Sequence, residues 1–541
     1  MKSLLKKRVL IPVLAIGIFI STSAFKNDFF EIAKQIEIFT TLFKELNMNY
    51  VDETNPGDLM DTAIKSMLND LDPYTKFHNE QDVESYKINN SGEYTGIGAG
   101  INRKNGRLFV TEPFKDYPAD KAGLKAGDEI IQVDNIKVSD FKEDTGTLLK
   151  GAPNSTVEIT YLRQGKEHKT TLTRSAIDID AVPFSKKINE NTGYIVLKKF
   201  NSKAFAQTKK AVVDLKTEGA TQLILDLRGN PGGLLRESIR IVNLFVPKGE
   251  VIVTTKSKVK KYNKVYTTKD DPLDTEIPLV VLVNGSSASA SEIVSGALQD
   301  LDRAVVIGSR SFGKGLVQRP KKLTYGTQLK VTISRYYTPS GRCIQALDYW
   351  NRDEKGNAVK TKEKDYNAFK TKNGRTVYDG GGVDPDIKID NESLSNISKA
   401  LIQEQILFNF CTDFYYKNSF NDLSSFTFTD KDYESFKQFV INSDFNYKTK
   451  TEKLLERLKS QTEKDEIGVE QDIKNLETAI VNAKNNALNT HKEELKSLLA
   501  DQLVMRYFYR EGLYHYHIQN HEAIQKAIAI MNSKEYQNIL K

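Results

Sequence analysis

The chain of 541 residues is longer than one hydrophobic core usually organises, which excludes a small single-domain protein and predicts several domains. Its 78 basic and 71 acidic residues leave a net charge of +7, and this mild excess does not indicate a nucleic acid partner. We interpret these charges as an ordinary solvated surface.

Residues 1–25 have the layout of a secretory signal, because four basic residues within positions 2–8 precede an apolar run over 9–20 and small residues over 21–24. We therefore predict export to the periplasm or envelope. The apolar run approaches the length of a membrane span, so an uncleaved membrane anchor is the alternative. In an oxidising compartment Cys343 and Cys411 could pair, but two cysteines give no disulfide framework and we predict that both are free.

Residues 26–90 are predicted to form a helical N-terminal region. Apolar residues recur at helical spacing from Phe29 to Phe43, and a second helix is predicted over 58–71. Asn55-Pro-Gly breaks the chain between the two helices.

Residues 91–175 change to short strands joined by glycine turns, predicted at 96–98, 108–110, 129–133 and 157–161. The run Pro118–Asp128, which leads into the third of these strands, resembles part of a bacterial PDZ domain. Such a domain adds a peptide C-terminus as a strand to an open sheet edge and holds its carboxylate with backbone N–H groups. The resemblance places the peptide-binding loop at Tyr94, Thr95, Gly96, Ile97 and Gly98, where glycines allow N–H groups to converge.

From 176 to about 390 predicted strands alternate with predicted helices, which is typical of an α/β core. Strands are predicted at 194–197, 223–227, 278–283, 304–308 and 327–337, and helices at 204–216, 234–245 and 291–301. The sequence R-G-N-P-G-G at 228–233 is a strand-to-helix turn by itself. The charged segment 348–379 is predicted to be a surface insertion.

Small residues after the buried strand at 278–283 lead into a helix and place Ser289 at the corner. A serine nucleophile needs a base within hydrogen-bond reach. No histidine lies between residues 169 and 490, which excludes a Ser-His-Asp triad within this region. Lys314, in a glycine-flanked turn, is the remaining candidate, because a desolvated lysine can be neutral and accept a proton.

Two other interpretations compete. The serines around Ser289 could simply cap a helix. Residues 308–315 also come close to a phosphate-binding P-loop, but Gly315 replaces the required hydroxyl and Pro320 follows where a helix is needed.

The joint pattern S-A-S-A-S-E-I, R-A-x-x-x-G and F-G-K-G-x-V-Q resembles the C-terminal processing peptidases, also called tail-specific proteases, over roughly residues 30–390. The resemblance implies that Ser289 is the nucleophile, Lys314 the general base and Gln318 the residue that positions the lysine. It also implies an oxyanion hole made by the Ala290 N–H and by Gly232 or Gly233. Neither a metal nor another cofactor is expected.

Residues 391–541 are predicted to form a helical C-terminal domain that lies beyond these motifs and binds a partner protein or a second copy of the chain. His515, His517 and His521 lie close together here, and we interpret them as solvated histidines rather than metal ligands.

The sequence thus predicts a multidomain α/β protein in which a PDZ domain at 91–175 accompanies a Ser/Lys protease core at 176–390, between helical terminal regions. We expect an exported serine endopeptidase whose substrates are proteins or peptides with free C-termini. The alternative is an inactive PDZ-bearing scaffold, although intact Ser289, Lys314 and Gln318 argue against it.

Overall fold

A computed structural model describes residues 29–141, 144–354, 356–389, 394–443 and 445–541. The chain forms two compact units, one of residues up to 78 with 320–331 and one of 79–319 with 332–541, and each is described by itself. The predicted signal or anchor at 1–25 lies outside the described residues. Among the helices that are described, none combines the length and apolar character needed to cross a membrane.

The smaller unit contains the predicted N-terminal helices. The chain is helical over 29–49, and α2 (Pro56–Asn69) follows, capped by the Asn55 side chain, which accepts from the Gly57 and Asp58 N–H groups. Strand β1 (Lys76–His78) pairs antiparallel with residues 328–330 of β18 (Gln328–Tyr337).

Short strands form the region that resembles a PDZ domain, after α3 (Glu80–Ser91). Its elements are β2 (Glu93–Gly96), β3 (Ala99–Lys104), β4 (Arg107–Pro113), α4 (Pro118–Lys121), β5 (Glu129–Val133), β6 (Ile136–Lys137), α5 (Gly146–Leu149), β7 (Thr156–Arg163), β8 (Lys166–Thr173) and β9 (Ser175–Asp178). The main sheet has the order β3-β4-β5-β7-β8, so β3 is an edge strand. The strand predicted at 96–98 is wrong, because β2 ends at Gly96 and Ile97-Gly98 turns into β3.

The α/β region is built on a six-stranded sheet of order β10-β11-β12-β15-β16-β23, parallel except for the β10-β11 pair. Its strands and helices confirm the predicted alternation: β10 (Phe184–Lys187), β11 (Thr192–Val196), α6 (Ala204–Thr217), β12 (Gln222–Asp226), α7 (Leu235–Asn243), β15 (Leu279–Val283), α8 (Ala290–Asp300), β16 (Val305–Gly308) and β23 (Ile387–Lys388).

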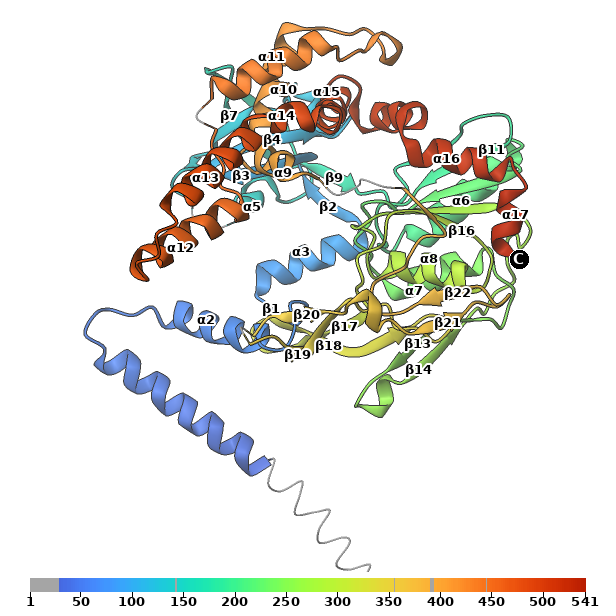
Figure 1. Ribbon diagram of the computed structural model, residues 1–541, viewed down its shortest axis with the longest axis horizontal. Coiled ribbons are helices and arrows are strands. Elements are labelled where there is room, and N and C mark those ends of the chain that lie inside the picture. Colours follow the sequence, from blue (N-terminus) through green and yellow to red (C-terminus); the bar gives the residue numbers. More distant parts are fainter. Residues whose placement is uncertain (1–28, 142–143, 355, 390–393, 444) are drawn as a thin grey trace, which may run out of the picture. The chain divides into compact units, whose positions relative to one another are not determined.

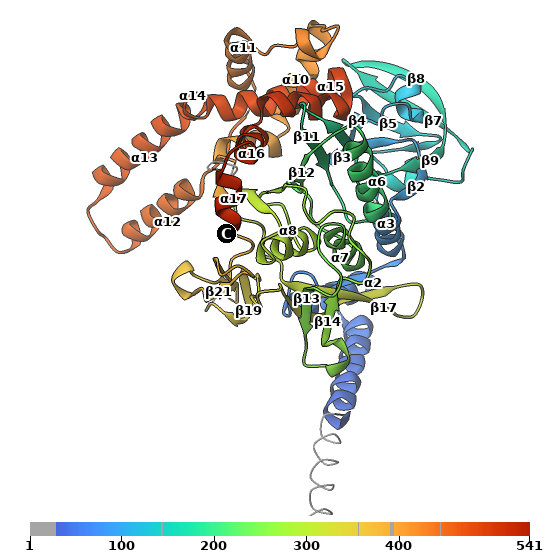
Figure 2. The ribbon, with the colours of Figure 1, turned by 90° about the vertical axis from the view of Figure 1, so that its right-hand side faces the viewer.

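Both faces of this sheet are covered, as a parallel sheet requires. Alternate residues such as Leu225 and Val281 pack against α6, α7 and α8 on one face. Residues such as Ile224 and Val280 pack on the other face against α16 (Glu522–Met531) and α17 (Glu535–Leu540) (Figures 1 and 2). The end of the C-terminal region is therefore part of the α/β core.

A second sheet contains β13 (Val251–Lys256), β14 (Lys264–Thr267), β17 (Leu316–Lys322) and β18 (Gln328–Tyr337). Two hairpins follow, β19 (Leu347–Arg352) with β20 (Ala358–Lys360) and β21 (Ala368–Lys370) with β22 (Thr376–Tyr378). The prediction of a surface insertion is wrong for the second hairpin. Its Arg375 is largely buried and bonds Asp302 and Asp386 at 2.6 Å each, so the hairpin is tied into the core.

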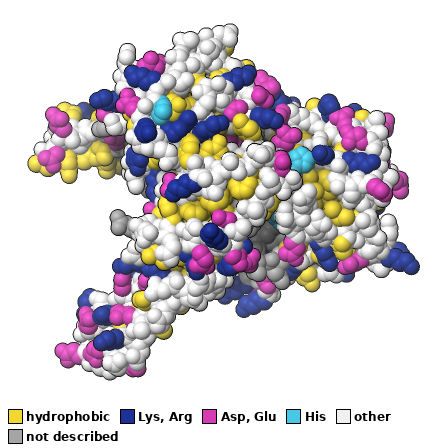
Figure 3. All heavy atoms as spheres, turned by 90° about the horizontal axis from the view of Figure 1, so that it is seen from above, with side chains coloured by type: hydrophobic (Ala, Val, Ile, Leu, Met, Phe, Trp, Pro, Cys, Tyr) yellow, Lys and Arg dark blue, Asp and Glu magenta, His cyan; other side chains and the backbone are white. Residues whose placement is uncertain are grey.

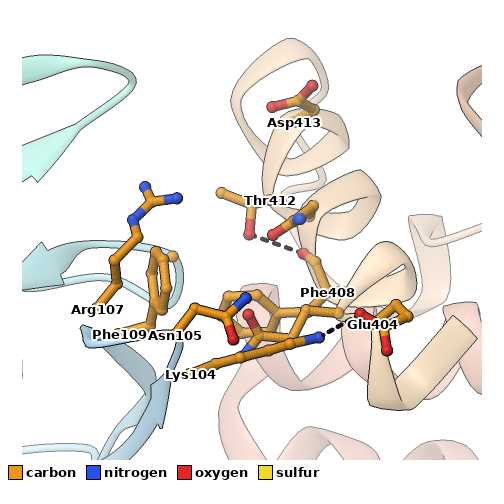
Figure 4. A pocket seen from close by; sticks show the side chains of 11 residues that line it. Lys104, Asn105, Arg107, Phe109, Glu404, Phe408, Thr412 and Asp413 are labelled. Atoms are coloured by element: carbon orange, nitrogen blue, oxygen red, sulfur yellow. Dashed lines mark hydrogen bonds and ion pairs between the residues drawn. The ribbon is translucent and has the colours of Figure 1, made fainter. Parts of the chain in front are cut away.

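The remaining helices confirm the predicted helical C-terminal region: α9 (Asn396–Gln403), α10 (Ile406–Lys417), α11 (Asp430–Ile441), α12 (Lys450–Lys464), α13 (Glu470–Asn485), α14 (Ala487–Thr490) and α15 (Lys492–Asn520). These helices contact the PDZ-like region through several side chains, among them Tyr509 and Glu404. Tyr509, whose φ of 57° and ψ of −171° interrupt α15, donates its hydroxyl to Asp120 at 2.8 Å. Lys104 on β3 donates to Glu404 before α10 at 2.8 Å, beside a pocket of about 410 Å³ (Figure 4).

Candidate active site

Ser289 lies at the corner between β15 and α8, as predicted. Its backbone has φ 56° and ψ −108°, a conformation that non-glycine residues rarely adopt. Such strain costs about 1–3 kcal/mol and persists only where the surroundings enforce it. The side chain is partly exposed, so its hydroxyl can be reached by a substrate.

The Glu292 carboxylate, one turn along α8 and fully buried, holds the segments around this corner together. Its Oε1 accepts from the Ser311 hydroxyl and the Gly313 N–H, each at 2.6 Å. Its Oε2 accepts from the Ser289 N–H at 2.8 Å and the Lys314 N–H at 2.9 Å. Burial raises the pKa of Glu292, and these four hydrogen bonds act in the opposite direction by stabilising the ionised form.

The same carboxylate oxygen therefore joins the backbones of Ser289 and Lys314, which lie twenty-five residues apart in the sequence. The Phe312 N–H also donates to the Ser287 carbonyl at 3.1 Å, so the lysine turn is docked on the serine segment at a second point. The structure brings the two predicted catalytic residues together.

The turn at 228–233 lies against this corner. A β-carbon on Gly232 would come within 2.9 Å of Ser289 Cβ and 2.6 Å of the Ala288 carbonyl oxygen, so only glycine fits there. The Gly232 N–H donates to Asn230 Oδ1 at 2.9 Å and is already used. Within the described part of the chain, the N–H groups of Gly233 and Ala290 have no hydrogen-bond partner.

Gln318 lies on β17, and its Nε2 donates to Thr332 Oγ1 on β18 at 3.2 Å. This contact ties Gln318, on the strand that follows Lys314, to the neighbouring strand β18. Its positioning of the lysine stays a prediction.

Two residues of this site were missed by sequence reasoning. Tyr336 on β18 donates its hydroxyl to the Ser289 carbonyl at 3.2 Å and its N–H to the Gly315 carbonyl at 2.9 Å. Nothing in the local sequence marks Tyr336. Glu292 could have been found, because an acid three residues after a serine at a helix start is the signature of a capping box.

The predicted peptide-binding loop Tyr94–Gly98 connects β2 to the edge strand β3. Among the described residues, the Ile97 and Gly98 N–H groups have no hydrogen-bond partner, whereas both carbonyls are used, by Ala119 and Phe114. Gly98 has φ 72° and approaches Tyr117 so closely that a β-carbon would lie 2.4 Å from the tyrosine Cβ. Burial raises the pKa of Tyr94 to about 12, which keeps its hydroxyl neutral.

Three family models match the chain: Peptidase family S41 over residues 191–349, PDZ domain over 95–173, and Probable PDZ-protease, C-terminal helical domain over 397–531. A carboxy-terminal-processing protease of Bartonella bacilliformis is 35% identical over 323 residues, covering 58% of this chain and 73% of the relative. The chain belongs to the carboxy-terminal-processing protease family.

Two further proteins are similar to this chain. A probable CtpA-like serine protease of Staphylococcus haemolyticus is 33% identical over 332 residues, covering 61% of this chain and 66% of the relative, so the chain spans slightly less than two thirds of that protein. A solved structure titled photosystem II D1 C-terminal processing protease is 27% identical and covers 66% of this chain and 93% of that chain, with a TM-score of 0.36.

In this family member, a residue of the C-terminal helices contacts the turn that carries Gly232 and Gly233. His521 caps α16, and its Nε2 lies 2.6 Å from Nη1 of Arg228, the first residue of that turn. Arg228 also bonds the buried Asp226 at 2.7 Å. Burial alone would raise the pKa of Asp226, but the Arg228 guanidinium reverses the shift and holds it below the usual range.

The interpretation of all three histidines as solvated is wrong for His521. Burial, with the Arg228 charge beside it, lowers the pKa of His521 to about 3, so the imidazole is neutral. His517 bonds Asp501 at 2.9 Å. Across the residues that the structure covers, no group of three or more His, Cys, Asp or Glu side chains could hold a metal ion.

Acid is expected to destabilise the contact between His521 and Arg228. The unfolded chain binds a proton at this histidine below a pH of about 6.5, whereas the folded chain does not until about pH 3. Stability is therefore fully present above pH ~6.5 and is lost as the pH falls, by about 2 kcal/mol at pH ~5. His521→Asn, which can still cap α16, should lose less stability than the parent between pH 7 and 5 in urea titrations. Equal losses in both proteins would contradict this account.

Replacing Glu292 with glutamine tests whether the shared carboxylate positions the catalytic residues. An amide presents one oxygen and one NH₂ where two oxygens now accept four hydrogen bonds, so at least one backbone N–H loses its acceptor. We expect kcat to fall roughly 10- to 100-fold with a smaller change in KM, because a small misplacement weakens the transition state more than substrate binding. Steady-state kinetics beside a thermal melt would separate this from a folding defect, and an unchanged kcat would reject the positioning role.

Proposed function

We propose that the protein is an exported serine endopeptidase that cleaves through an acyl-enzyme on Ser289 with Lys314 as general base. One observation supports this most strongly: a single oxygen of the buried Glu292 accepts hydrogen bonds from the backbones of both residues. The strained backbone of Ser289 and its exposed corner also suit a nucleophile. Export rests on the sequence of residues 1–25 alone.

In the proposed mechanism the neutral Lys314 amine accepts the Ser289 hydroxyl proton as Oγ attacks the substrate carbonyl carbon. The tetrahedral oxyanion accepts hydrogen bonds from the Ala290 and Gly233 N–H groups, which are free to donate, whereas the Gly232 N–H is used by Asn230. Each such donor stabilises a comparable transition state by roughly 2.7–4 kcal/mol. The lysine ammonium then protonates the leaving amine, and water hydrolyses the acyl-enzyme.

The proposed substrates are proteins or peptides with a free C-terminus. The free N–H groups of Ile97 and Gly98 could receive the carboxylate, and the open edge of β3 could pair with the residues that precede it. Helical regions could bind an adaptor or a second copy. No observation points to a nucleic acid substrate.

Amidation of the substrate C-terminus is expected to weaken binding. It removes the negative charge and so converts charge-assisted hydrogen bonds at Ile97 and Gly98 into weaker ones. A peptide and its amide of the same sequence should differ in Kd by roughly tenfold or more in fluorescence anisotropy with the Ser289→Ala protein, which cannot consume them. Equal affinities would reject a carboxylate-reading loop without touching the catalytic proposal.

The alternative is an inactive scaffold that binds C-termini through the same loop. It predicts that the parent and the Ser289→Ala protein bind peptides equally and that neither cleaves an unfolded protein. Incubating both with a disordered protein and following fragments on a gel distinguishes the two functions.

A further inference from the structure

Positive charge is concentrated in two segments of the second sheet. Residues 251–269 contain six lysines and residues 315–337 contain five lysines or arginines, and neither segment contains an aspartate or glutamate. The net charge of the whole chain is only +7, so the rest of the chain is net negative.

The first segment folds into the β13–β14 hairpin, which projects from the sheet (Figure 2). We call the five lysines at 256, 258, 260, 261 and 264 the basic hairpin, and all five are exposed. Within the described residues none of them makes an ion pair. Lys256 lies directly opposite Arg335 of β18 in the strand register, and like charges in that position repel. An anionic partner would remove this repulsion.

Apolar side chains lie among these lysines. Val259 in the hairpin loop is 46% exposed and Val265 on β14 is 62% exposed. Lysines are common on edge strands because they prevent aggregation, but β14 is the edge strand and carries only Lys264 of the five. On the face shown in Figure 3, by contrast, basic and acidic side chains are interspersed.

We propose that the basic hairpin docks the protein on an anionic phospholipid surface. Lysines near such a surface each strengthen binding by about fivefold, and exposed valines between them can enter the headgroup region. A nucleic acid site would favour arginine forks, and the five cations of the hairpin are all lysines.

Co-sedimentation of the full chain with lipid vesicles tests this proposal. The triple variant Lys258→Gln, Lys260→Gln, Lys261→Gln is compared with Lys209→Gln, Lys431→Gln, Lys474→Gln, which removes the same charge from scattered exposed positions. We expect the hairpin variant to bind phosphatidylglycerol-containing vesicles on the order of 100-fold more weakly than the parent, and the control variant to bind almost as well. The differences should shrink in high salt and vanish on pure phosphatidylcholine. The parent and both triple variants share residues 1–25, so this segment cannot produce the differences in binding between them.

A second measurement localises the contact. An environment-sensitive dye on Val259→Cys, in a Cys343→Ser background, should shift to the blue with anionic vesicles, whereas the same dye on Ile441→Cys should not. Hydrolysis of a soluble peptide by the hairpin variant should equal that of the parent, which keeps this test separate from the catalytic proposal. Equal binding by both triple variants, or no shift at Val259, would overturn the lipid surface. If the parent bound polyglutamate but not vesicles, and the hairpin variant bound neither, the hairpin would instead be assigned to acidic polypeptides.

Discussion

Ser289→Ala is expected to lower kcat by a factor on the order of 10⁶, because no other group in the proposed mechanism can form the acyl-enzyme. The substitution leaves the backbone of the corner and the Ser289 N–H bond to Glu292 in place. We therefore expect the melting temperature to change little. Cleavage of a disordered protein, followed on gels and by single-turnover kinetics, measures the loss.

Ser289→Gly is the matched control for strain at this corner. Glycine adopts the observed φ of 56° without steric cost, but it also makes the unfolded chain more flexible. With strain of about 1–3 kcal/mol at such positions, we expect the glycine variant to be about 1 kcal/mol more stable than the alanine variant, and equally inactive. If either variant still cleaved, the nucleophile would have to be another residue. Ser287 and Ser291 are poor candidates because both are fully buried.

Lys314→Arg is expected to lower kcat roughly 10²- to 10⁴-fold, or more if the nucleophile and base act as a unit. Arginine keeps the positive charge but cannot accept a proton in a protein. The hydrogen bond from the residue 314 N–H to Glu292 does not involve the side chain. A fall in kcat would therefore be caused by the loss of the lysine amine. Gln318→Ala should cost less, because Gln318 is proposed only to orient the amine.

The pH dependence of the parent enzyme gives an independent readout. If Lys314 must be neutral to act, kcat/KM rises with pH as the amine loses its proton, and the arginine variant lacks this rise. An arginine variant with full activity would refute the Ser/Lys assignment. It would also leave unexplained how the site functions without a histidine near Ser289.

The C-terminal helices have a larger structural role than their sequence indicates. α16 and α17 cover one face of the catalytic sheet, and the Tyr536 hydroxyl accepts from the Leu279 N–H at 2.9 Å on β15. At its kink, α15 bonds the PDZ domain through Tyr509 and through the Arg510–Glu112 pair. The helix then ends beside His521, which contacts Arg228. Shortening the chain before these helices would therefore expose the core, not remove a separate domain.

Local patterns were enough to predict much of this protein. The apolar run at 278–283, the small residues around Ser289 and the glycines beside Lys314 predicted the strand, the corner and the turn, because each depends on neighbours in the sequence. The alternation of strands and helices predicted the α/β core for the same reason. The family was predicted because the joint motifs around Ser289 and Lys314 resemble those of the C-terminal processing peptidases.

The tertiary structure alone decided what depends on residues distant in the chain. It showed that the Gly232 N–H already donates to the Asn230 side chain, and it placed Tyr336 on Ser289 and His521 on Arg228. It also paired residues 254–256 of one acid-free segment with residues 335–337 of another, which places Lys256 opposite Arg335. Contacts between residues that are distant in the sequence depend on which helices and strands pack together. The periodicity of apolar residues in the sequence does not specify that packing.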